Sequence, residues 1–312
     1  VAKNATEVDQ TGAFPQAAID ALRDSGMLGL ISAKSVGGLG QGPRAAALVV
    51  ERLARECAST AMVTCMHYTA TAVIEKYGAE AVRKQLAQGN HLATLAFSEA
   101  GSRSHFWAPV STARRDQNGI CLNARKNWVT SAHHATLYVW SSKPFAAEGA
   151  STLWLVPSDS SGISIAGSFD GLGLRGNDST PVTAENVLIP AHAMLGGDGQ
   201  GLAIMLETVL PLFNVLTAAT GIGLMEGATA AACNHVMGTR YEYLDSSLSE
   251  LPTIRAYLAR MRIATDQARC LWLDTLHALE TNREDVMLRV LECKAASGES
   301  ATQVLDTAMR VC

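Results

Sequence analysis

The sequence predicts an α+β protein made of an N-terminal α-helical domain, a middle antiparallel β-barrel-like domain and a C-terminal helical bundle. Apolar residues follow a helical period in the first 90 residues, a period close to two between about residues 91 and 195, and a helical period again from residue 196. No helical pattern separates the short apolar runs of the middle part, so parallel βαβ units are not expected. The expected domains are 1–90, 91–195 and 196–312.

The composition predicts a folded chain and argues against nucleic acid as its partner. Of the 312 residues, 48% are hydrophobic and 17% are charged, which allows a large core and excludes disorder as the main state. The net charge of −4, from 25 basic and 29 acidic residues, argues against a protein that binds nucleic acid through many phosphate contacts.

The N-terminal part predicts four helices. Pro43 suits the first turn of one of them. Proline has no amide hydrogen, and an amide in the first turn has no acceptor within the helix. Ser59 or Thr60 could cap the next helix, which runs to Tyr77. The other two helices are expected at about residues 14–26 and at 79–87.

The middle part predicts short strands joined by turns. The strands are expected at 92–98, 119–123, 137–141, 151–156, 162–165 and 181–189. Asp116-Gln117-Asn118-Gly119 predicts a hairpin turn, because Asn-Gly readily adopts positive φ angles. The arrangement that fits is a small antiparallel barrel or sandwich.

The C-terminal part predicts long helices at about residues 201–243, 252–280 and 284–311, the first being one helix or a kinked pair. Residues 208–225 carry no formal charge and reach the lower length limit of a membrane span. Pro211 and Asn214 in this stretch favour a core helix of the bundle, so no membrane span is predicted. The last helix reaches Cys312 without a capping residue, and we expect a C-terminal segment to follow it.

Cysteine usage predicts a reducing compartment. The seven cysteines include no C-x-x-C pair, which fits neither a disulfide framework nor a zinc site. Residues 1–24 contain no long apolar stretch, so no signal peptide is expected there. We therefore expect a cytoplasmic protein.

A Rossmann nucleotide site and a metal site are not expected. Residues 171–176 match G-x-G-x-x-G, but loop residues precede and follow them, whereas the mechanism needs a strand before the glycines and a helix after them. The eight histidines lack metal-ligand spacing, so no metal is predicted.

A polar loop and a tryptophan strand are the candidates for a binding site. Residues 97–105 bring hydroxyl groups, a glycine and backbone donors together after the first strand. Residues 126–131 alternate as in a strand, so Trp128 and Thr130 are expected to point to the same face. A flat side chain beside a hydroxyl group suits a planar heterocycle, although a core tryptophan is the simpler interpretation of these residues alone.

The order of these segments resembles that of the acyl-CoA dehydrogenase family of flavoproteins over essentially the whole chain. Leu95-Ala96-Phe97-Ser98-Glu99-Ala100-Gly101-Ser102 resembles the start of its Thr-Glu-Pro-x-Ala-Gly-Ser-Asp loop, and Lys126-Asn127-Trp128-Val129-Thr130-Ser131 resembles its Lys-x-Trp-Ile-Thr-Asn strand. The other similar segments are 37–40, 58–61, 77–80, 173–180, 187–191, 221–223 and 239–241.

The resemblance implies an FAD site and an assembly. It places Phe97 and Ser98 against the flavin ring, Trp128 packed on the ring, Thr130 near flavin N5 and O4, Ser104 near the pyrophosphate, and Arg240 on the FAD of a neighbouring subunit. A cation suits that last position, because the pyrophosphate carries two negative charges. A homodimer or homotetramer is therefore implied.

The resemblance also implies the α,β-dehydrogenation of an acyl thioester, either acyl-CoA or acyl carrier protein. This reaction needs a carboxylate base in a site that excludes water. The family's usual base position follows a Gly-Gly-x-Gly turn, which we expect beyond residue 312, and the rarer position is expected at Gly238 and Thr239. Glu242 is close to the latter but is expected to be solvated, so we assign no catalytic residue.

Departures from the family pattern keep a second hypothesis open. Arg103, His105 and Ala100 replace a glycine, an aspartate and a proline of the flavin loop, and Pro252 replaces a glutamine. These changes are compatible with an oxidase or monooxygenase that uses oxygen in place of an electron-transfer flavoprotein. A third hypothesis is a helical binding protein that has lost its flavin.

Overall fold

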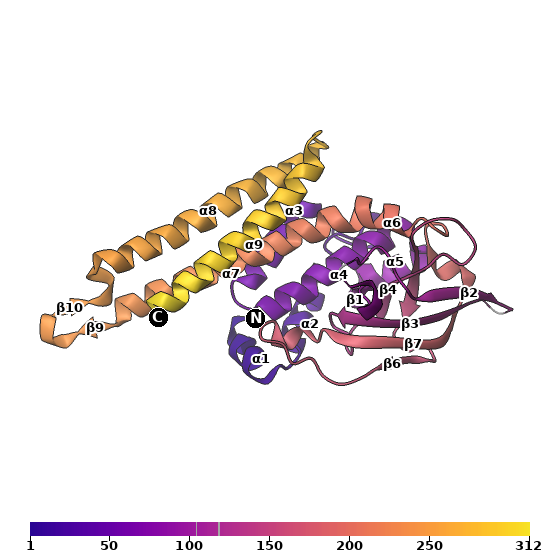
Figure 1. Ribbon diagram of the computed structural model, residues 1–312, viewed down its shortest axis with the longest axis horizontal. Helices are drawn as coiled ribbons and strands as arrows, with labels where there is room; N and C mark the ends of the chain where they lie inside the picture. The colour runs from indigo at the N-terminus through magenta and orange to yellow at the C-terminus, as the bar shows by residue number, and fades with distance from the viewer. Residues whose placement is uncertain (104, 118) are drawn as a thin grey trace.

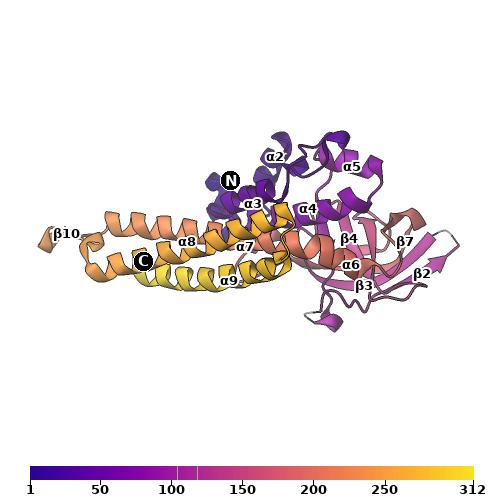
Figure 2. The same cartoon turned by 90° about the horizontal axis from the view of Figure 1, so that it is seen from above.

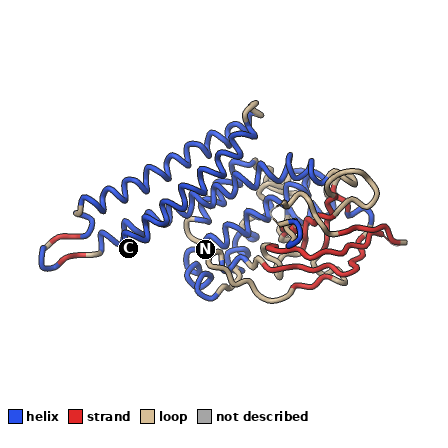
Figure 3. The backbone as a smooth tube through the Cα atoms, in the orientation of Figure 1, coloured by secondary structure: helices blue, strands red, loops and turns tan. Residues whose placement is uncertain are grey.

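A computed structural model of the chain describes residues 1–103, 105–117 and 119–312. Two four-stranded sheets lie at one end of the molecule, the N-terminal helices lie between them and its middle, and long helices run on to the opposite end (Figure 1). Figure 3 shows the same division by secondary structure, with most strands at one end. The order helix, strand, helix along the chain confirms the predicted fold class.

The described N-terminal residues form five α-helices. They are α1 (Ala5–Thr11), α2 (Gln16–Asp24), α3 (Pro43–Ala54), α4 (Ala58–Tyr77) and α5 (Glu80–Ala87). Of these, α4 and α5 pack on a sheet. The sequence did not predict α1, which is a short and mostly exposed helix. The predicted cap of α4 is wrong, because Cys57 takes the capping position and both Ser59 and Thr60 are buried within the helix.

The middle part forms two four-stranded sheets. One has the order β1-β4-β5-β8 and the other the order β2-β3-β7-β6. The strands are β1 (Ala93–Ala96), β2 (Thr112–Asp116), β3 (Gly119–Val129), β4 (Leu137–Ser142), β5 (Thr152–Pro157), β6 (Ile163–Ile165), β7 (Thr180–Ile189) and β8 (Met194–Leu195). The predicted hairpin joins β2 to β3, where Asp116 pairs with Gly119, while Asn118 lies outside the described residues.

One pairing departs from the antiparallel prediction. β1 pairs with β4 in parallel, and the other pairings of the two sheets are antiparallel. The chain leaves the first sheet after β1, forms β2 and β3 in the second sheet, and re-enters beside β1 in the same direction. Such a crossover permits a parallel pair without an intervening helix.

The two sheets form a sandwich with an aromatic core. Tyr138, Trp140 and Trp154 are fully buried between the sheets, with the apolar side chains of β3 and β7. The other face of the first sheet packs against α4, α5 and the start of the C-terminal helices. The first sheet is therefore buried on both faces, which explains why the residues of β4 are all buried.

A continuous helical run forms the centre of the C-terminal part. It comprises α6 (Gly201–Ile204), a π-helical turn (Met205–Val209) and α7 (Leu210–Gly238). Among the described residues, this run is the one long and apolar enough to cross a membrane by length and composition. It packs against α3, α4 and the two last helices, which is the predicted position of a core helix.

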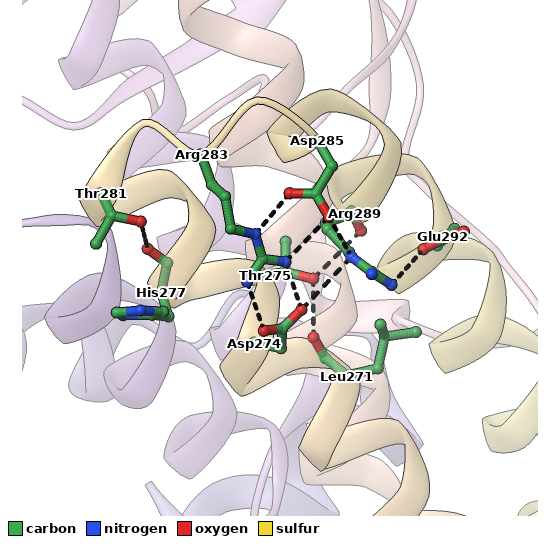
Figure 4. Close-up of polar contacts among 9 residues, drawn as sticks. All are labelled: Leu271, Asp274, Thr275, His277, Thr281, Arg283, Asp285, Arg289 and Glu292. Atoms are coloured by element: carbon green, nitrogen blue, oxygen red, sulfur yellow. Dashed lines mark hydrogen bonds and ion pairs between the residues drawn. The ribbon is translucent and has the colours of Figure 1, made fainter.

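The remaining two helices, α8 (Pro252–Thr281) and α9 (Val286–Val311), form an antiparallel hairpin along α7, as Figure 2 shows from above. A network of ion pairs holds their turn (Figure 4). Arg283 donates to Asp274 at 2.8 Å and to Asp285 at 2.6 Å, and Arg289 donates to Asp285 at 2.8 Å and to Glu292 at 3.1 Å. The network fixes where α9 begins, and hence which side chains it presents to α7.

Close packing of α7 on α3 makes Gly223 sensitive to substitution. A Cβ atom there would lie 2.6 Å from Cβ of Ala54 and would also collide with the backbone oxygen of Glu51. We expect Gly223→Ala to lower the free energy of unfolding by about 1–3 kcal/mol, because the two helices must move apart. Urea unfolding measures this loss.

Gly238→Ala is the matched control, because a Cβ atom there meets nothing within 4 Å. It should leave stability unchanged or raise it slightly, since alanine favours the helical conformation more than glycine does. Equal effects of the two substitutions would contradict the packing argument.

Candidate active site

A cavity of about 300 Å³ lies where the sheets meet α4, α7 and α9. Most of its lining is apolar, and this part consists of Met66, Leu95, Phe106, Val209, Leu210 and Phe213. Phe97 and Ser98 line it from the end of β1, and Trp128 lines it from the end of β3. The cavity therefore brings together three of the predicted flavin contacts.

A backbone irregularity turns Trp128 out of the sheet. The pairing of β3 with β7 shifts register between Lys126 and Val129, and Trp128 has a φ angle of 57°. A left-handed conformation at a bulky residue costs about 1–3 kcal/mol. The result is an indole that is 67% exposed, next to the cavity and in edge contact with Phe169. Strain of this kind persists where the surrounding structure enforces it, and it is common at binding sites.

A buried ion pair anchors the loop that follows Ser98. The carboxylate of Glu99 accepts hydrogen bonds from the backbone amides of Val110 and Ser111 at 2.8 and 3.0 Å. The ammonium group of Lys126, in β3, lies 2.5 Å from the same carboxylate and also donates to the carbonyl of Ser141 at 2.7 Å. These contacts tie both ends of the loop to the sheets.

Burial and charge act in opposite directions on this pair. Burial opposes ionisation of Glu99, but the nearby Lys126 and the hydrogen bonds to the carboxylate outweigh it and hold the pKa of Glu99 below its usual value. Burial lowers the pKa of Lys126 to about 8, although Glu99 favours its charged form. At neutral pH the pair is therefore ionised, and its role is to fix the loop.

Three polar side chains interrupt the apolar lining of the cavity, namely Ser98, Asn214 of α7 and Lys294 of α9. Asn214 is only 6% exposed, and its amide has no hydrogen-bond partner among the described residues. Lys294 is the one ionisable group among the described residues that line the cavity, so no carboxylate lines it. These groups leave hydrogen-bonding capacity for a ligand.

Of the other predicted site residues, Thr130 and Arg240 do not line this cavity. Thr130 is buried, and its hydroxyl lies 3.2 Å from that of Ser179, whereas Trp128 is exposed, and β3 ends at Val129, so the predicted regular strand through Ser131 is not present. The register shift before Val129 breaks the alternation of side chains on which that expectation depended. Ser104 lies outside the described residues.

Arg240 lies at the far end of the molecule. It begins β9 (Arg240–Tyr241), which pairs with β10 (Ser246–Ser247), and it forms an exposed ion pair with Asp245 at 2.9 Å. The hairpin is at the opposite end from the sheets in Figure 1. Along α7, the 24 residues from Asn214 to Gly238 span about 36 Å. Arg240 and the rarer base position at Gly238 and Thr239 therefore lie far from this cavity within one chain.

Sequence reasoning did not identify Asn214 and Lys294 as cavity residues. Asn214 is a buried amide within residues 208–225, a stretch without a formal charge, and Lys294 is the one lysine of α9. An isolated polar residue in an apolar stretch was the available signal for Asn214. Nothing in the sequence shows that the two helices meet at these residues.

Comparisons with known proteins agree with this architecture along the whole chain. Residues 1–89 match the acyl-CoA dehydrogenase N-terminal domain, residues 94–187 match the acyl-CoA dehydrogenase middle domain, and residues 199–312 match the acyl-CoA dehydrogenase C-terminal domain.

Individual relatives and structures are similar over nearly all of the chain. The mitochondrial short-chain specific acyl-CoA dehydrogenase of Homo sapiens is 27% identical, over 98% of this chain and 75% of that protein. The probable acyl-CoA dehydrogenase FadE25 of Mycobacterium tuberculosis is 26% identical, over 100% of this chain and 81% of that protein. The structure of butyryl-CoA dehydrogenase from Megasphaera elsdenii has a TM-score of 0.91 at 22% identity, covering 99% of this chain and 83% of that one. With its three domains matched in order, the chain belongs to the acyl-CoA dehydrogenase family.

Proposed function

We propose that the chain is part of an FAD-dependent oxidoreductase that removes hydrogen from the α and β carbons of an acyl thioester. Membership of the acyl-CoA dehydrogenase family supports the reaction class. The single observation that carries the proposal for this chain is the cavity beside the exposed, strained indole of Trp128. An exposed aromatic ring at the mouth of an apolar cavity suits a flat cofactor and an acyl chain.

The residues present fit a flavin. Trp128 offers a ring for packing, and the hydroxyl of Ser98 and the backbone at the end of β1 offer hydrogen bonds beside it. Phe97 would close the apolar side. Thr130 and Ser104 remain proposed contacts on the strength of the resemblance. Bound FAD would supply the acceptor for the hydride of the β carbon.

The protein groups have to hold the acyl chain and keep water away from it. The apolar side chains from α4 and α7 do this in the proposed site, because they enclose the cavity on the side away from the sheets. The base that takes the α proton is not assigned, since no carboxylate lies among the described residues of the cavity lining.

For the electron acceptor we propose an electron-transfer flavoprotein, which fits a dehydrogenase. Oxygen is the alternative, and one observation favours keeping it. The loop after Glu99 departs from the family pattern at Ala100, Arg103 and His105, and Arg103 has a φ angle of 51°. Ser98 and Phe106, on either side of these positions, both line the cavity, so a loop that differs in charge there bears on the access of oxygen to the site.

We also propose that the chain acts as a homodimer or homotetramer. Large apolar side chains are exposed on α8 and α9, among them Ile263, Leu288, Leu291 and Met309. Apolar surface of this kind is typical of subunit interfaces. A second subunit would also allow Arg240, which is remote from the cavity of its own chain, to reach a partner's FAD. Analytical ultracentrifugation tests this assembly.

A cytoplasmic location remains our proposal for the compartment. All seven cysteines are free in the structure, which supports a reducing environment. Fractionation of the source cells tests it.

Anaerobic mixing of the FAD-loaded protein with an acyl-CoA tests the proposed reaction. The expected result is loss of the visible absorbance of oxidised flavin together with formation of the enoyl thioester. Slow reoxidation in air and fast reoxidation by an electron-transfer flavoprotein would support a dehydrogenase. Fast reoxidation with release of peroxide or a hydroxylated product would support the oxygen-using alternative. A protein that binds no FAD would contradict both.

Trp128→Ala should weaken FAD binding by roughly tenfold, because aromatic packing contributes about 0.5–1.5 kcal/mol beyond the buried area. Fluorescence titration of the apoprotein with FAD measures the dissociation constant. Leu188→Ala is the control, since Leu188 is an exposed apolar residue of β7 that does not line the cavity. Equal affinity of Trp128→Ala and the wild type would remove Trp128 from the proposed site.

A further inference from the structure

Two polar residues of the cavity have no hydrogen-bond or ion-pair partner among the residues that the structure describes. An acyl chain and a flavin ring need an apolar lining, yet Asn214 and Lys294 line the same cavity. Burying a polar amide without a hydrogen bond is costly, and Asn214 is only 6% exposed. Lys294 forms no ion pair or hydrogen bond with the residues that the structure describes.

Packing of α7 on α9 brings these two residues together. The two helices run in the same direction, away from the sheets (Figures 1 and 2). The hydroxyl of Ser297 in α9 donates to the carbonyl of Ala218 in α7 at 2.9 Å, which fixes their register. One helical turn earlier on each helix, Asn214 therefore stands beside Cys293 and Lys294. Both Asn214 and Lys294 line the cavity there.

The pair has the chemistry of a carboxylate site. An ammonium group supplies a positive charge and up to three donors, and a primary amide supplies two further donors. No acidic side chain among the described lining residues competes for them. A carboxylate held by both would receive charge-assisted hydrogen bonds, weakened on the lysine side because Lys294 is exposed.

We propose that Asn214 and Lys294 form an anion-binding end of the acyl pocket, selecting acyl thioesters whose acyl chain ends in a carboxylate. This inference rests on the proposed function, because it assumes that the acyl chain enters this cavity. The cavity of about 300 Å³ also has to admit the edge of the proposed flavin, so a short acyl group is the appropriate probe.

A matched pair of CoA thioesters tests the preference without turnover. In both, sulfur replaces the β carbon, so no β hydride can be removed. One is (carboxymethylthio)acetyl-CoA, which ends in a carboxylate, and the other is (ethylthio)acetyl-CoA, which has the same length and ends in a methyl group. Calorimetric titration of the FAD-loaded enzyme gives both dissociation constants. The wild type should bind the carboxylate thioester about tenfold more tightly, a moderate ratio because Lys294 is an exposed residue.

Substitutions of Lys294 and Asn214 test whether these residues cause the preference for the carboxylate thioester. Lys294→Met should abolish the tenfold ratio, Lys294→Arg should retain most of it, and Asn214→Asp should reverse it by placing a negative charge in the pocket. Arg310→Met is the control, because Arg310 is an exposed cation of the same helix that does not line the cavity. It should leave the ratio unchanged, because Arg310 is paired with Asp306 and lies about 24 Å along α9 from Lys294, where solvent screens its attraction to the additional carboxylate.

The outcomes separate this inference from the proposed function. Binding of the ethyl thioester with no preference for the carboxylate would leave the function standing and overturn the inference. An unchanged ratio in Lys294→Met would overturn it too, even if that variant altered the flavin spectrum, since Lys294 would then face the cofactor. Failure of both thioesters to bind would contradict the acyl thioester function, and the inference with it.

Discussion

Lys126→Met should lower the free energy of unfolding by about 3–5 kcal/mol, because it leaves the buried carboxylate of Glu99 without its counter-charge. Lys126 is fully buried, and its ammonium group also donates to the carbonyl and hydroxyl of Ser141 at 2.7 and 2.9 Å. A methionine fills similar space but offers no donor. Urea unfolding measures the loss, and a lower FAD occupancy should accompany it, since the pair anchors the loop after Ser98.

Two further variants test whether the charge causes this loss. Lys143→Met removes an exposed lysine just after β4 and should change the free energy of unfolding by less than about 0.5 kcal/mol. The double substitution Glu99→Gln with Lys126→Met should recover part of the stability, because no unpaired carboxylate remains. A double variant as unstable as the sum of the two single variants would show that packing, and not charge, is lost.

Acidification should destabilise the protein through His67, a fully buried residue of α4. The amide of Ala93 donates to its Nδ1 at 3.1 Å, and its Nε2 lies 2.9 Å from the carbonyl oxygen of Leu28. An amide can only donate and a carbonyl can only accept, so the ring is neutral with its proton on Nε2. Burial lowers the pKa of His67 to about 4.

The direction of the pH effect follows from this lowered pKa. Between the unfolded pKa of about 6.5 and the folded pKa of about 4, the unfolded state binds more protons, so stability falls as the pH is lowered through that range. The shift of about 2.5 pH units corresponds to about 3 kcal/mol. Above about pH 6.5 and below about pH 4 this group contributes no further slope.

Comparison with His67→Gln isolates that contribution from those of the carboxylates. Glutamine keeps a donor and an acceptor but does not gain a proton, so its variant should be less stable at pH 7.5 and should lose less stability on acidification. The stability difference between wild type and His67→Gln should therefore shrink by about 3 kcal/mol between pH 7 and pH 4. His192→Gln, at an exposed position, is the control. Parallel pH curves for the wild type and His67→Gln would refute the assignment.

Hydrophobic periodicity predicted the fold well where burial determines local structure. The core strands β4, β5 and β7 and the long helices α7, α8 and α9 lie close to their predicted positions. β2 was missed, because four of its five residues are exposed and only Ala113 is buried, so it has no apolar alternation. The parallel pairing of β1 with β4 could not be predicted, since it depends on which sheet receives each strand.

The candidate site was predictable only in part. Phe97, Ser98 and Trp128 do line one cavity, as their place in the loop and strand led us to expect. The exposure of Trp128 was not predictable, because a register shift and a positive φ angle reverse the side-chain direction that a regular strand would give. Asn214 and Lys294 are 80 residues apart in sequence and come to line one cavity through the packing of α7 on α9, which no local pattern encodes.

The π-helical turn at Met205–Val209 holds one residue more than an α-helical turn would. One residue in a helix corresponds to a rotation of about 100° about the axis. Val209 closes this turn and lines the cavity together with Leu210, the first residue of α7. The π-helical turn therefore rotates α7 relative to α6. Because of this rotation, α6 packs on the first sheet while Asn214 of α7 lines the cavity. Deletion of one residue from this turn, with every side chain of the cavity lining kept, would rotate α6 or α7 by about 100° and turn a different set of its side chains towards the core.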